Sequence, residues 1–312
     1  MEIIRGLESY PPDSPPTVVA LGTFDGVHLA HRKILATAVG RARALGVAAL
    51  ACTFDRHPLE VLQPSRAPIA ITNLEENLAL MASEGLDATV VIAFTREFSG
   101  IEPETFVRDV LLRTLKTREV VVGFNHTFGR GARGNAELLQ ELAPTLGFVA
   151  HVVAPMTVDG VVVSSSGIRQ ALQAGDVQLA MRFLCRPYRV RGRVLRGSGR
   201  GRQLGFPTAN LRPEREPLLA PGVYAARAYW AAGESGAVVN VGVRPTFGDG
   251  EYWVEAYVKD FSGDLYDQEL ALAFLERIRP EKMFPSIDAL RAQVARDIEV
   301  AARLLAQSPE RS

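Results

Sequence analysis

Glycines and arginines run through the segment GSGRGRQLGFPTAN, Gly197 to Asn210, which ends in a Pro-Thr-Ala-Asn tetrad. Backbone without a Cβ atom can approach a phosphate closely, and guanidinium groups can neutralise its charge. Thr208 and Asn210 stand two residues apart, so an extended backbone would turn both oxygens to one face, where they suit Mg²⁺. A flexible basic turn is the alternative interpretation, but such a turn needs no paired oxygens after it.

Two histidines, His28 and His31, form a second candidate for phosphate chemistry. They close the segment GTFDGVHLAH (Gly22–His31), between an apolar run and an amphipathic stretch. Histidines three apart at a helix entrance can point the same way as the free N–H groups of the first turn, which makes an anion site. A structural pair or a metal fragment is the alternative, although no third ligand stands nearby to complete a zinc site.

The first part of the chain alternates apolar runs, typical of buried strands, with amphipathic helical patterns. We predict strands at Thr17–Gly22, Val47–Phe54, Ala88–Phe94, Glu119–Gly123 and Phe148–Ala154. We predict helices at Arg32–Leu45, Asn73–Glu84 (capped by Thr72, with Glu75 three residues on), Pro103–Leu115 and Ala136–Leu146. This order indicates a doubly wound, Rossmann-like α/β domain, whose ligand lies beyond the carboxyl ends of parallel strands.

The later part of the chain is dominated by strand patterns separated by Gly, Asp and Pro turns. We predict strands at Tyr188–Leu195, Gly222–Trp230, Ala237–Val243, Tyr252–Lys259 and Leu270–Ile278. Their spacing indicates a small antiparallel β-barrel of Greek-key type, followed by a helix at Ser286–Leu305 that lies against it. We place the boundary near Arg186, which gives two domains, 1–186 and 187–312.

Composition excludes several classes of protein. The 312 residues suit two domains, and 35 basic against 35 acidic residues argue against a general nucleic-acid binder. No apolar run approaches the roughly 20 residues that span a bilayer, and the start of the chain is too charged and proline-rich for a signal peptide. Cys52 and Cys185 do not make a disulfide framework. We therefore expect a cytoplasmic protein without nucleic-acid or membrane partners, and leave its oligomeric state open.

These segments resemble the prokaryotic family of bifunctional riboflavin kinases/FMN adenylyltransferases, or FAD synthetases, from roughly Val18 to Ala306. Gly197–Asn210 resembles the flavokinase signature. Gly22–His31 resembles the histidine signature of nucleotidylyltransferases, and its Thr-Phe-Asp-Gly opening points to the flavin branch, although Ala30 stands where glycine is usual. The resemblance implies an adenylyltransferase domain at 1–186 and a riboflavin kinase domain at 187–312, with ATP, riboflavin and FMN as substrates and Mg²⁺ as the metal.

The resemblance implies that FMN and ATP give FAD and pyrophosphate in the first domain. FMN phosphate is already an anion and needs no general base, so the protein must supply alignment and positive charge. We assign that role to His28, His31 and Arg169, the last from VSSSGIRQAL, which resembles an S-S-T-x-I-R signature. Its serines could instead cap a helix. The implied nucleotide-binding residues are Gly22, Phe24, Asp25, Gly26, Asn125, Ser164, Ser165 and Ser166, and the implied flavin-binding residues are Asp55, His57 and Pro58.

The second domain would phosphorylate riboflavin, whose neutral ribityl hydroxyl needs a base. The resemblance maps the family's glutamate onto Glu255, for which an exposed strand carboxylate is the alternative; Tyr257 stands where the family commonly has histidine. Thr208 and Asn210 would hold Mg²⁺, and Arg279 would lie near the flavin ring. The implied cradle for the ATP phosphates comprises Gly197, Gly199, Gly201 and Arg202, which differs from a Walker A loop because no Lys-Ser/Thr pair closes it.

Two other functions compete with this one. A relative of class I aminoacyl-tRNA synthetases is suggested by the paired histidines and by EKMFPS (Glu281–Ser286), but the neutral net charge and the all-β second half speak against it. A non-catalytic flavin or nucleotide sensor is the other, which the joint presence of the proposed catalytic and metal-binding residues disfavours. Aminoacylation of tRNA would support the first, and binding without ATP turnover the second.

Overall fold

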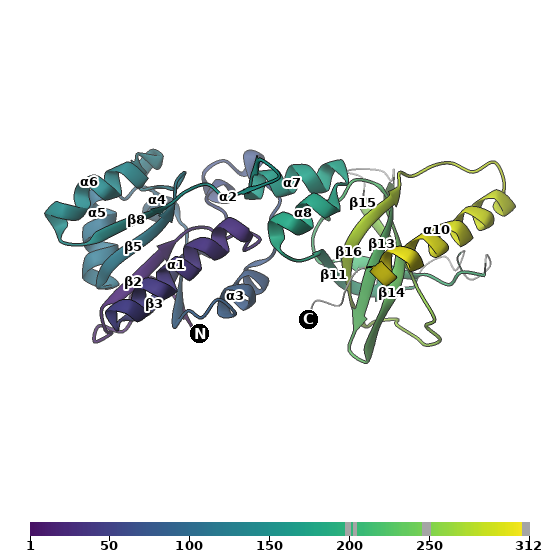
Figure 1. Ribbon diagram of the computed structural model, residues 1–312, viewed down its shortest axis with the longest axis horizontal. Coiled ribbons are helices and arrows are strands. Elements are labelled where there is room, and N and C mark those ends of the chain that lie inside the picture. The colour runs from purple at the N-terminus through teal and green to yellow at the C-terminus, as the bar shows by residue number, and fades with distance from the viewer. Residues whose placement is uncertain (197–200, 202–204, 245–250, 308–312) are drawn as a thin grey trace. The chain divides into compact units, whose positions relative to one another are not determined.

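The computed structural model describes residues 1–196, 201, 205–244 and 251–307. By its internal contacts the chain divides into two compact units, Met1–Ser165 and Ser166–Ser312, which we call the N-terminal and C-terminal units. Helices alternate with strands in the first, and strands predominate in the second (Figure 1). The domain boundary at residue 186 stays a prediction.

The N-terminal unit is built on a six-stranded parallel sheet, in the order β1-β4-β3-β2-β5-β8. Its strands are β1 (Glu2–Arg5), β2 (Thr17–Leu21), β3 (Ala48–Phe54), β4 (Ala88–Ile92), β5 (Thr117–Gly123) and β8 (Val149–Val153). Two small hairpins pair β6 (Thr127–Phe128) with β7 (Gly134–Asn135), and β9 (Thr157–Val158) with β10 (Val161–Val162). The five predicted strands and the parallel sheet are confirmed, whereas the short edge strand β1 was missed.

Helices cover both faces of this sheet. The helices are α1 (Leu29–Leu45), α2 (Pro58–Leu62), α3 (Leu74–Ala82), α4 (Arg96–Ser99), α5 (Pro103–Thr105), the π-helix η3 (Phe106–Thr114) and α6 (Ala136–Leu146), with single 3₁₀ turns at η1 (Leu7–Ser9), η2 (Pro64–Arg66) and η4 (Arg130–Ala132). Alternate strand residues pack on η3 and α6 on one face, and on α1 and the end of α3 on the other. This is the doubly wound arrangement expected for the first part of the chain.

One detail of the predicted helices was wrong. Asn73, not Thr72, caps α3, and its capping box closes with Glu76 instead of Glu75. The segment after Thr105 is a π-helix, in which the backbone N–H of Leu115 donates to the carbonyl of Val110 at 3.0 Å. Hydrophobic periodicity does not distinguish a π-helix from an α-helix, because both turn one face to the sheet.

The C-terminal unit contains a closed antiparallel barrel with the strand order β11-β12-β15-β14-β13-β16. The strands are β11 (Tyr188–Leu195), β12 (Ala209–Pro213), β13 (Gly222–Trp230), β14 (Gly233–Arg244), β15 (Glu251–Val258) and β16 (Glu269–Arg279). The predicted barrel and its five predicted strands are confirmed. The sixth, β12, was missed because its residues had been interpreted only as a ligand-binding tetrad.

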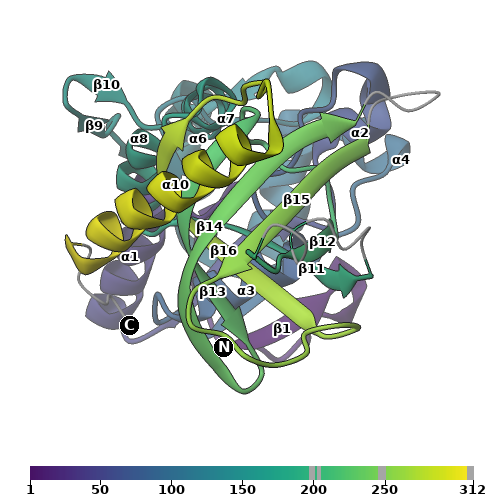
Figure 2. The same cartoon turned by 90° about the vertical axis from the view of Figure 1, so that its right-hand side faces the viewer.

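Among the described residues, the helices α7 (Ser165–Ala174), α8 (Val177–Leu184) and α10 (Ile287–Gln307) accompany the barrel. α8 packs on β16, and Gln178 at its start donates to Glu276 at 2.9 Å. α10, the predicted final helix, lies across β13, β14 and β16 (Figure 2). In the described part of the chain, no helix has the length and apolar character that crossing a bilayer requires.

Candidate active sites

His28 is the N-cap of α1. Its backbone is extended, with φ −77° and ψ 174°, and its side chain accepts a hydrogen bond from the backbone N–H of His31 through Nδ1, at 3.3 Å. Because Nδ1 is the acceptor, a neutral His28 ring carries its proton on Nε2. The helix begins at Leu29, three residues before the predicted start, so both histidines stand at its first turn. This is the end at which a helix favours an anion.

The rings of the two histidines are packed together. Their centroids lie 3.6 Å apart with an interplanar angle of 17°, and Phe24 meets His31 edge-on at 5.3 Å. Burial of the ring and, next, the proximity of His28 lower the pKa of His31 well below its ordinary value. Within the described residues, His31 Nδ1 is buried without a hydrogen-bond partner. His31 is therefore uncharged near neutral pH, so it offers hydrogen bonding more than charge.

Asp25 holds the loop before α1 in place. Its Oδ1 accepts from the backbone N–H groups of Ile71 at 2.9 Å and Thr72 at 3.3 Å, and its carbonyl oxygen accepts from Ser165 Oγ at 3.0 Å. Gly26 N–H donates to Thr72 Oγ1 at 2.9 Å and to Asn77 Oδ1 at 3.1 Å. Thr72 and Asn77 therefore support this loop, a role that no local sequence pattern revealed.

The same loop contains unusual backbone geometry. Phe24 and Val27 have φ values of 49° and 36°, in a region that β-branched and bulky residues rarely adopt. Gly26 has φ 81°, and a Cβ there would lie 3.0 Å from Ile71. Both Phe24 and Val27 are buried, so packing maintains the strained turn. Strain held by packing is common where a loop must present ligand-binding groups in one conformation.

The loops after neighbouring strands lie at the same edge of the sheet as the histidines, because β3 and β5 flank β2 in parallel. Asp55, after β3, accepts from the backbone N–H of Phe94 through Oδ1 at 2.9 Å and pairs with Arg56 at 2.9 Å. His57 caps α2, which begins at Pro58, by accepting from Leu59 N–H at 3.1 Å. Asp55 and His57 thus shape this predicted flavin-side loop through its backbone.

Asn125 lies exposed in the turn that follows β5. Its Oδ1 comes within 3.5 Å of the position that a Cβ on Gly123 would occupy, beside Ile34 of α1. Gly22, at the end of β2, similarly leaves room for the Phe24 ring, 3.1 Å from where its Cβ would be. Ser164 precedes α7 and Ser165 begins it, whereas Ser166 and Arg169 belong to the C-terminal unit. The assignment of these residues to the nucleotide stays a prediction.

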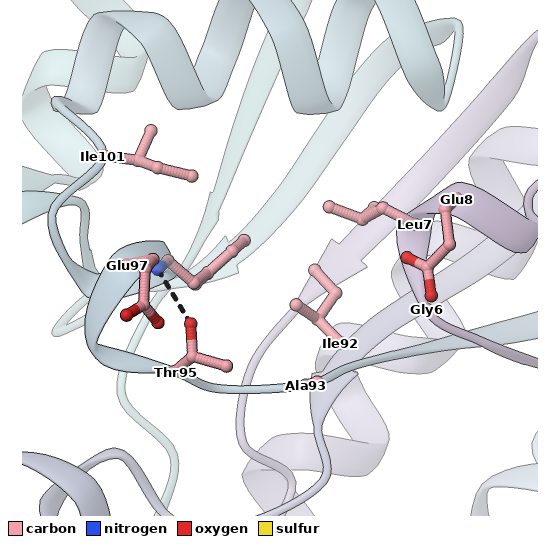
Figure 3. Close-up of a pocket in the computed structure, with 9 residues that line it drawn as sticks. Gly6, Leu7, Glu8, Ile92, Ala93, Thr95, Glu97 and Ile101 are labelled. Carbon is pink, nitrogen blue, oxygen red and sulfur yellow. Dashed lines mark hydrogen bonds between the residues drawn. The ribbon is translucent and has the colours of Figure 1, made fainter.

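A pocket of about 350 Å³ opens at the carboxyl ends of β1 and β4. Leu7 and Ile92 point into it, and the carboxylates of Glu8 and Glu97 lie on opposite sides (Figure 3). Hydrogen bonds from its own backbone and from Thr95 hold the pKa of Glu97 below its ordinary value. No sequence pattern indicated this pocket, because its walls come from segments that carry no motif.

In the C-terminal unit, one row of the barrel brings three polar residues together. Glu255 on β15 stands directly opposite Asn210 on β12 and Asn240 on β14. Directly opposed residues share a face, and their side chains lie about 4.5–5.5 Å apart at Cβ. The next residue on β15, Ala256, and the preceding one, Val254, are fully buried. Glu255 therefore faces away from the barrel interior, between two amides.

Asn210 is 8% exposed, and its Oδ1 is buried without a hydrogen-bond partner in the described part of the chain. An unsatisfied buried acceptor costs roughly 1–3 kcal/mol, which a bound cation or donor would recover. Thr208 lies just before β12, with its hydroxyl 2.8 Å from where a Cβ on Gly201 would be. A hydroxyl and an amide oxygen are ligands that suit Mg²⁺, so the residues present fit this metal.

Gly201 packs against the backbone of Phe206, which directly precedes the Pro-Thr-Ala-Asn tetrad. Its carbonyl accepts from the backbone N–H of Phe206 at 2.9 Å, and a Cβ at Gly201 would lie 2.5 Å from the carbonyl oxygen of Phe206. Only glycine fits such a close approach of two backbone segments. The other predicted residues of the phosphate cradle, Gly197, Gly199 and Arg202, lie outside the described residues.

Arg279 pairs with the final helix of the chain. Its guanidinium makes hydrogen bonds of 3.1, 3.0 and 2.7 Å to Asp297 of α10, and Asp297 is 2% exposed. The same group lies 5.7 Å from the ring centroid of Phe284. Through these hydrogen bonds, Arg279 attaches α10 to the end of β16. A contact with flavin stays a prediction.

Comparison with known proteins divides the chain in the same two parts. A family model described as FAD synthetase matches residues 10–167, and one described as riboflavin kinase matches residues 184–305. A bifunctional riboflavin kinase/FMN adenylyltransferase of Pseudomonas fluorescens is 36% identical over 312 residues, which is 100% of both chains. The protein of the same name from Escherichia coli K12 is 34% identical over 307 residues and 97% of each chain.

A crystal structure of a Streptococcus pneumoniae protein, named a macrolide-efflux protein, also matches. It superposes with a TM-score of 0.88 at 29% identity and covers 97% of this chain and 99% of its own. The similarity in fold therefore extends over nearly the whole sequence.

Proposed function

The chain belongs to the family of bifunctional riboflavin kinases/FMN adenylyltransferases, and on that premise we propose how its residues divide the two reactions. The enzyme transfers the γ-phosphoryl group of ATP to riboflavin, giving FMN and ADP. It then transfers the adenylyl group of a second ATP to FMN, giving FAD and pyrophosphate. We assign the first reaction to the barrel and the second to the parallel-sheet domain.

For adenylylation, an oxygen of the FMN phosphate attacks the α-phosphorus of ATP, and the bond to the β-phosphate oxygen breaks. No proton has to leave the nucleophile, so the protein's task is alignment and charge stabilisation. The Nε2–H of His28 and the N–H groups at the start of α1 donate hydrogen bonds to the phosphates, and Asp25 holds this loop in position. Arg169 neutralises the departing pyrophosphate, and Asp55, His57 and Pro58 bound the flavin side.

For phosphorylation, the oxygen of the terminal ribityl hydroxyl attacks the γ-phosphorus of ATP, and ADP leaves. The Glu255 carboxylate takes the proton that this hydroxyl loses. The observation that supports this assignment best is the direct opposition of Glu255 and Asn210, since it sets a base beside an unsatisfied amide oxygen. Gly201 lies next to the phosphates of ATP.

An ATP-dependent enzyme of this family requires a divalent cation, and we propose Mg²⁺ held by Thr208 and Asn210. When bound, Mg²⁺ supplies positive charge to the ATP phosphates. The two protein oxygens orient the bound nucleotide toward Glu255, and the close packing of Gly201 against Thr208 limits how far the hydroxyl can move. We also propose a cytoplasmic location, because both reactions consume ATP.

The test is a time course of the pure chain with riboflavin, ATP and Mg²⁺, with FMN and FAD separated by chromatography. We expect FMN to appear first and FAD to follow. Equal aliquots supplied with FMN in place of riboflavin should yield FAD without a lag. Binding of riboflavin and ATP without turnover would instead indicate a sensor, and charging of tRNA would indicate a synthetase relative.

A further inference from the structure

The outward face of β15 carries an aromatic residue beside Glu255. Tyr257 follows Glu255 by two residues, so both side chains lie on the same face of the strand, and the intervening Ala256 is fully buried. The Tyr257 ring meets the ring of Phe206 in a T-shaped contact, with centroids 5.9 Å apart and an interplanar angle of 85°. This contact joins β15 to the loop before the Pro-Thr-Ala-Asn tetrad.

The two proposed metal ligands are held in different ways. Asn210 lies within β12, where its backbone is paired with Glu255 and its neighbour Ala209 with Ala256. Thr208 precedes the first residue of that strand, so strand pairing does not fix it. Its contacts are with Gly201, where a Cβ would lie 2.8 Å from the Thr208 hydroxyl, and Gly201 in turn accepts a hydrogen bond from the Phe206 N–H at 2.9 Å.

We propose that Tyr257 is a positioning residue of the kinase site, which holds Phe206 and thereby sets Thr208 at the right distance from Asn210 and Glu255. The inference rests on the proposed function, because it takes Thr208, Asn210 and Glu255 as the site. An edge-to-face aromatic contact stabilises its two rings beyond what their buried area contributes. The phenol hydroxyl takes no part, so a phenylalanine at position 257 keeps the contact.

The first experiment compares Tyr257→Ala with Tyr257→Phe by titrating Mg²⁺ in the riboflavin kinase reaction. We expect Tyr257→Ala to raise the Mg²⁺ concentration for half-maximal rate about tenfold, which corresponds to about 1.4 kcal/mol, while Tyr257→Phe stays within about twofold of the unmodified protein. Adenylylation of supplied FMN should be the same in all three proteins.

A second readout needs neither metal nor substrate. Because the Tyr257 ring holds Phe206, Tyr257→Ala should accelerate hydrogen exchange of the Phe206 backbone amide in the free protein at least fivefold, and Tyr257→Phe should not. The matched control is Phe261→Ala, which removes a T-shaped pair with Trp230 at 5.2 Å on the same barrel. That variant should leave both the Mg²⁺ titration and exchange at Phe206 unchanged.

A double-variant cycle shows whether Tyr257 acts through Thr208. In a Thr208→Ala background, Tyr257→Ala should change the Mg²⁺ dependence less than twofold. The inference is overturned if Tyr257→Ala leaves the titration and the exchange rate unchanged, if Tyr257→Phe is as impaired as Tyr257→Ala, or if the two substitutions are additive. If Thr208→Ala and Glu255→Gln both retain full FMN formation, the proposed function itself fails, which is a separate outcome.

Discussion

The rings of His28 and His31 are stacked with their centroids 3.6 Å apart, at the first turn of α1. Two positive charges at that separation would repel by roughly 5 kcal/mol at an effective dielectric constant of about 20. The rings therefore do not carry two charges in the free protein, and burial and the proximity of His28 hold the pKa of His31 low enough to keep its ring neutral near pH 7. Hydrogen bonds from neutral imidazole and from the helix N–H groups are what this pair offers a phosphate.

We predict that His31→Ala slows FAD formation from supplied FMN by about 10²–10³-fold. The substitution removes an imidazole that can hydrogen-bond a phosphate, and it leaves the His28 ring without its stacked neighbour. FMN formation from riboflavin should stay within about twofold, so FMN accumulates when both substrates are given. The measurement is kcat/KM for each half-reaction. His151→Ala is the control, since His151 lies on β8 and pairs with Glu119 at 2.7 Å. Equal losses in both half-reactions of a folded variant would contradict the assignment of separate sites.

We predict that Glu255→Gln lowers the rate of FMN formation by at least about 10²-fold, because the amide cannot accept the ribityl proton. FAD synthesis from supplied FMN should persist. Asn210→Ala should also suppress FMN formation, in a manner partly restored by high Mg²⁺. Glu234→Gln, an exposed carboxylate at the start of β14, should behave like the unmodified protein. A Glu255→Gln enzyme with undiminished kinase activity would exclude Glu255 as the base.

The sequence was sufficient to predict both architectures because their signals are local. Apolar runs separated by amphipathic stretches give the parallel sheet, and β11 shows strict alternation of buried and exposed residues. The histidine pair and Glu255 were proposed as site residues from motifs whose spacing is fixed by one turn of helix or one strand. These features depend only on neighbours in the chain.

The features that were missed depend on contacts between distant segments. The hydrogen bonds of Asp25 with the backbone of Ile71 and Thr72 join residues more than forty positions apart, and no periodicity in the sequence predicts them. The cap of α3 was assigned to Thr72, but that residue binds Gly26 instead, which leaves Asn73 to cap the helix. Similarly, Arg279 was assigned to flavin from its motif alone, whereas its partner Asp297 becomes evident only when α10 is folded against β16.

Because of His126, we predict that the stability of the N-terminal unit depends on pH. Burial lowers its pKa to about 4, whereas an unfolded histidine titrates near 6.5. The unfolded chain therefore binds more protons than the folded protein between these pH values. The contribution of His126 to the free energy of unfolding is complete above about pH 6.5 and is lost as the pH falls toward 4. By linkage the loss amounts to at most about 3 kcal/mol.

We predict that His126→Phe removes this part of the acid destabilisation, because the new ring keeps the contact with Phe128, now 5.9 Å from His126, and has nothing to protonate. The measurement is the free energy of unfolding of both proteins from pH 7 to pH 4.5. The variant should lose less stability than the unmodified protein, and the difference should grow as the pH falls. Parallel curves across this range would show that His126 is accessible to protons in the folded state.

The ion pair between Arg279 and Asp297 is buried, with the two side chains 16% and 4% exposed, so we expect either partner to be costly to remove alone. Asp297→Ala leaves a guanidinium without its counter-charge and should lower the free energy of unfolding by about 3–5 kcal/mol. Arg279→Ala should cost a similar amount, while the double variant Arg279→Met/Asp297→Leu should be much less destabilised than the sum of the two. Thermal unfolding of the single variants and of the double variant Arg279→Ala/Asp297→Ala measures this coupling.

The KM for riboflavin tests whether Arg279 has a second role. If Arg279 also contacts flavin, Arg279→Ala raises that KM more than Asp297→Ala does. If its role is only to attach α10, the two variants change KM equally; a stable Asp297→Ala protein would show that the pair does not hold the helix at all.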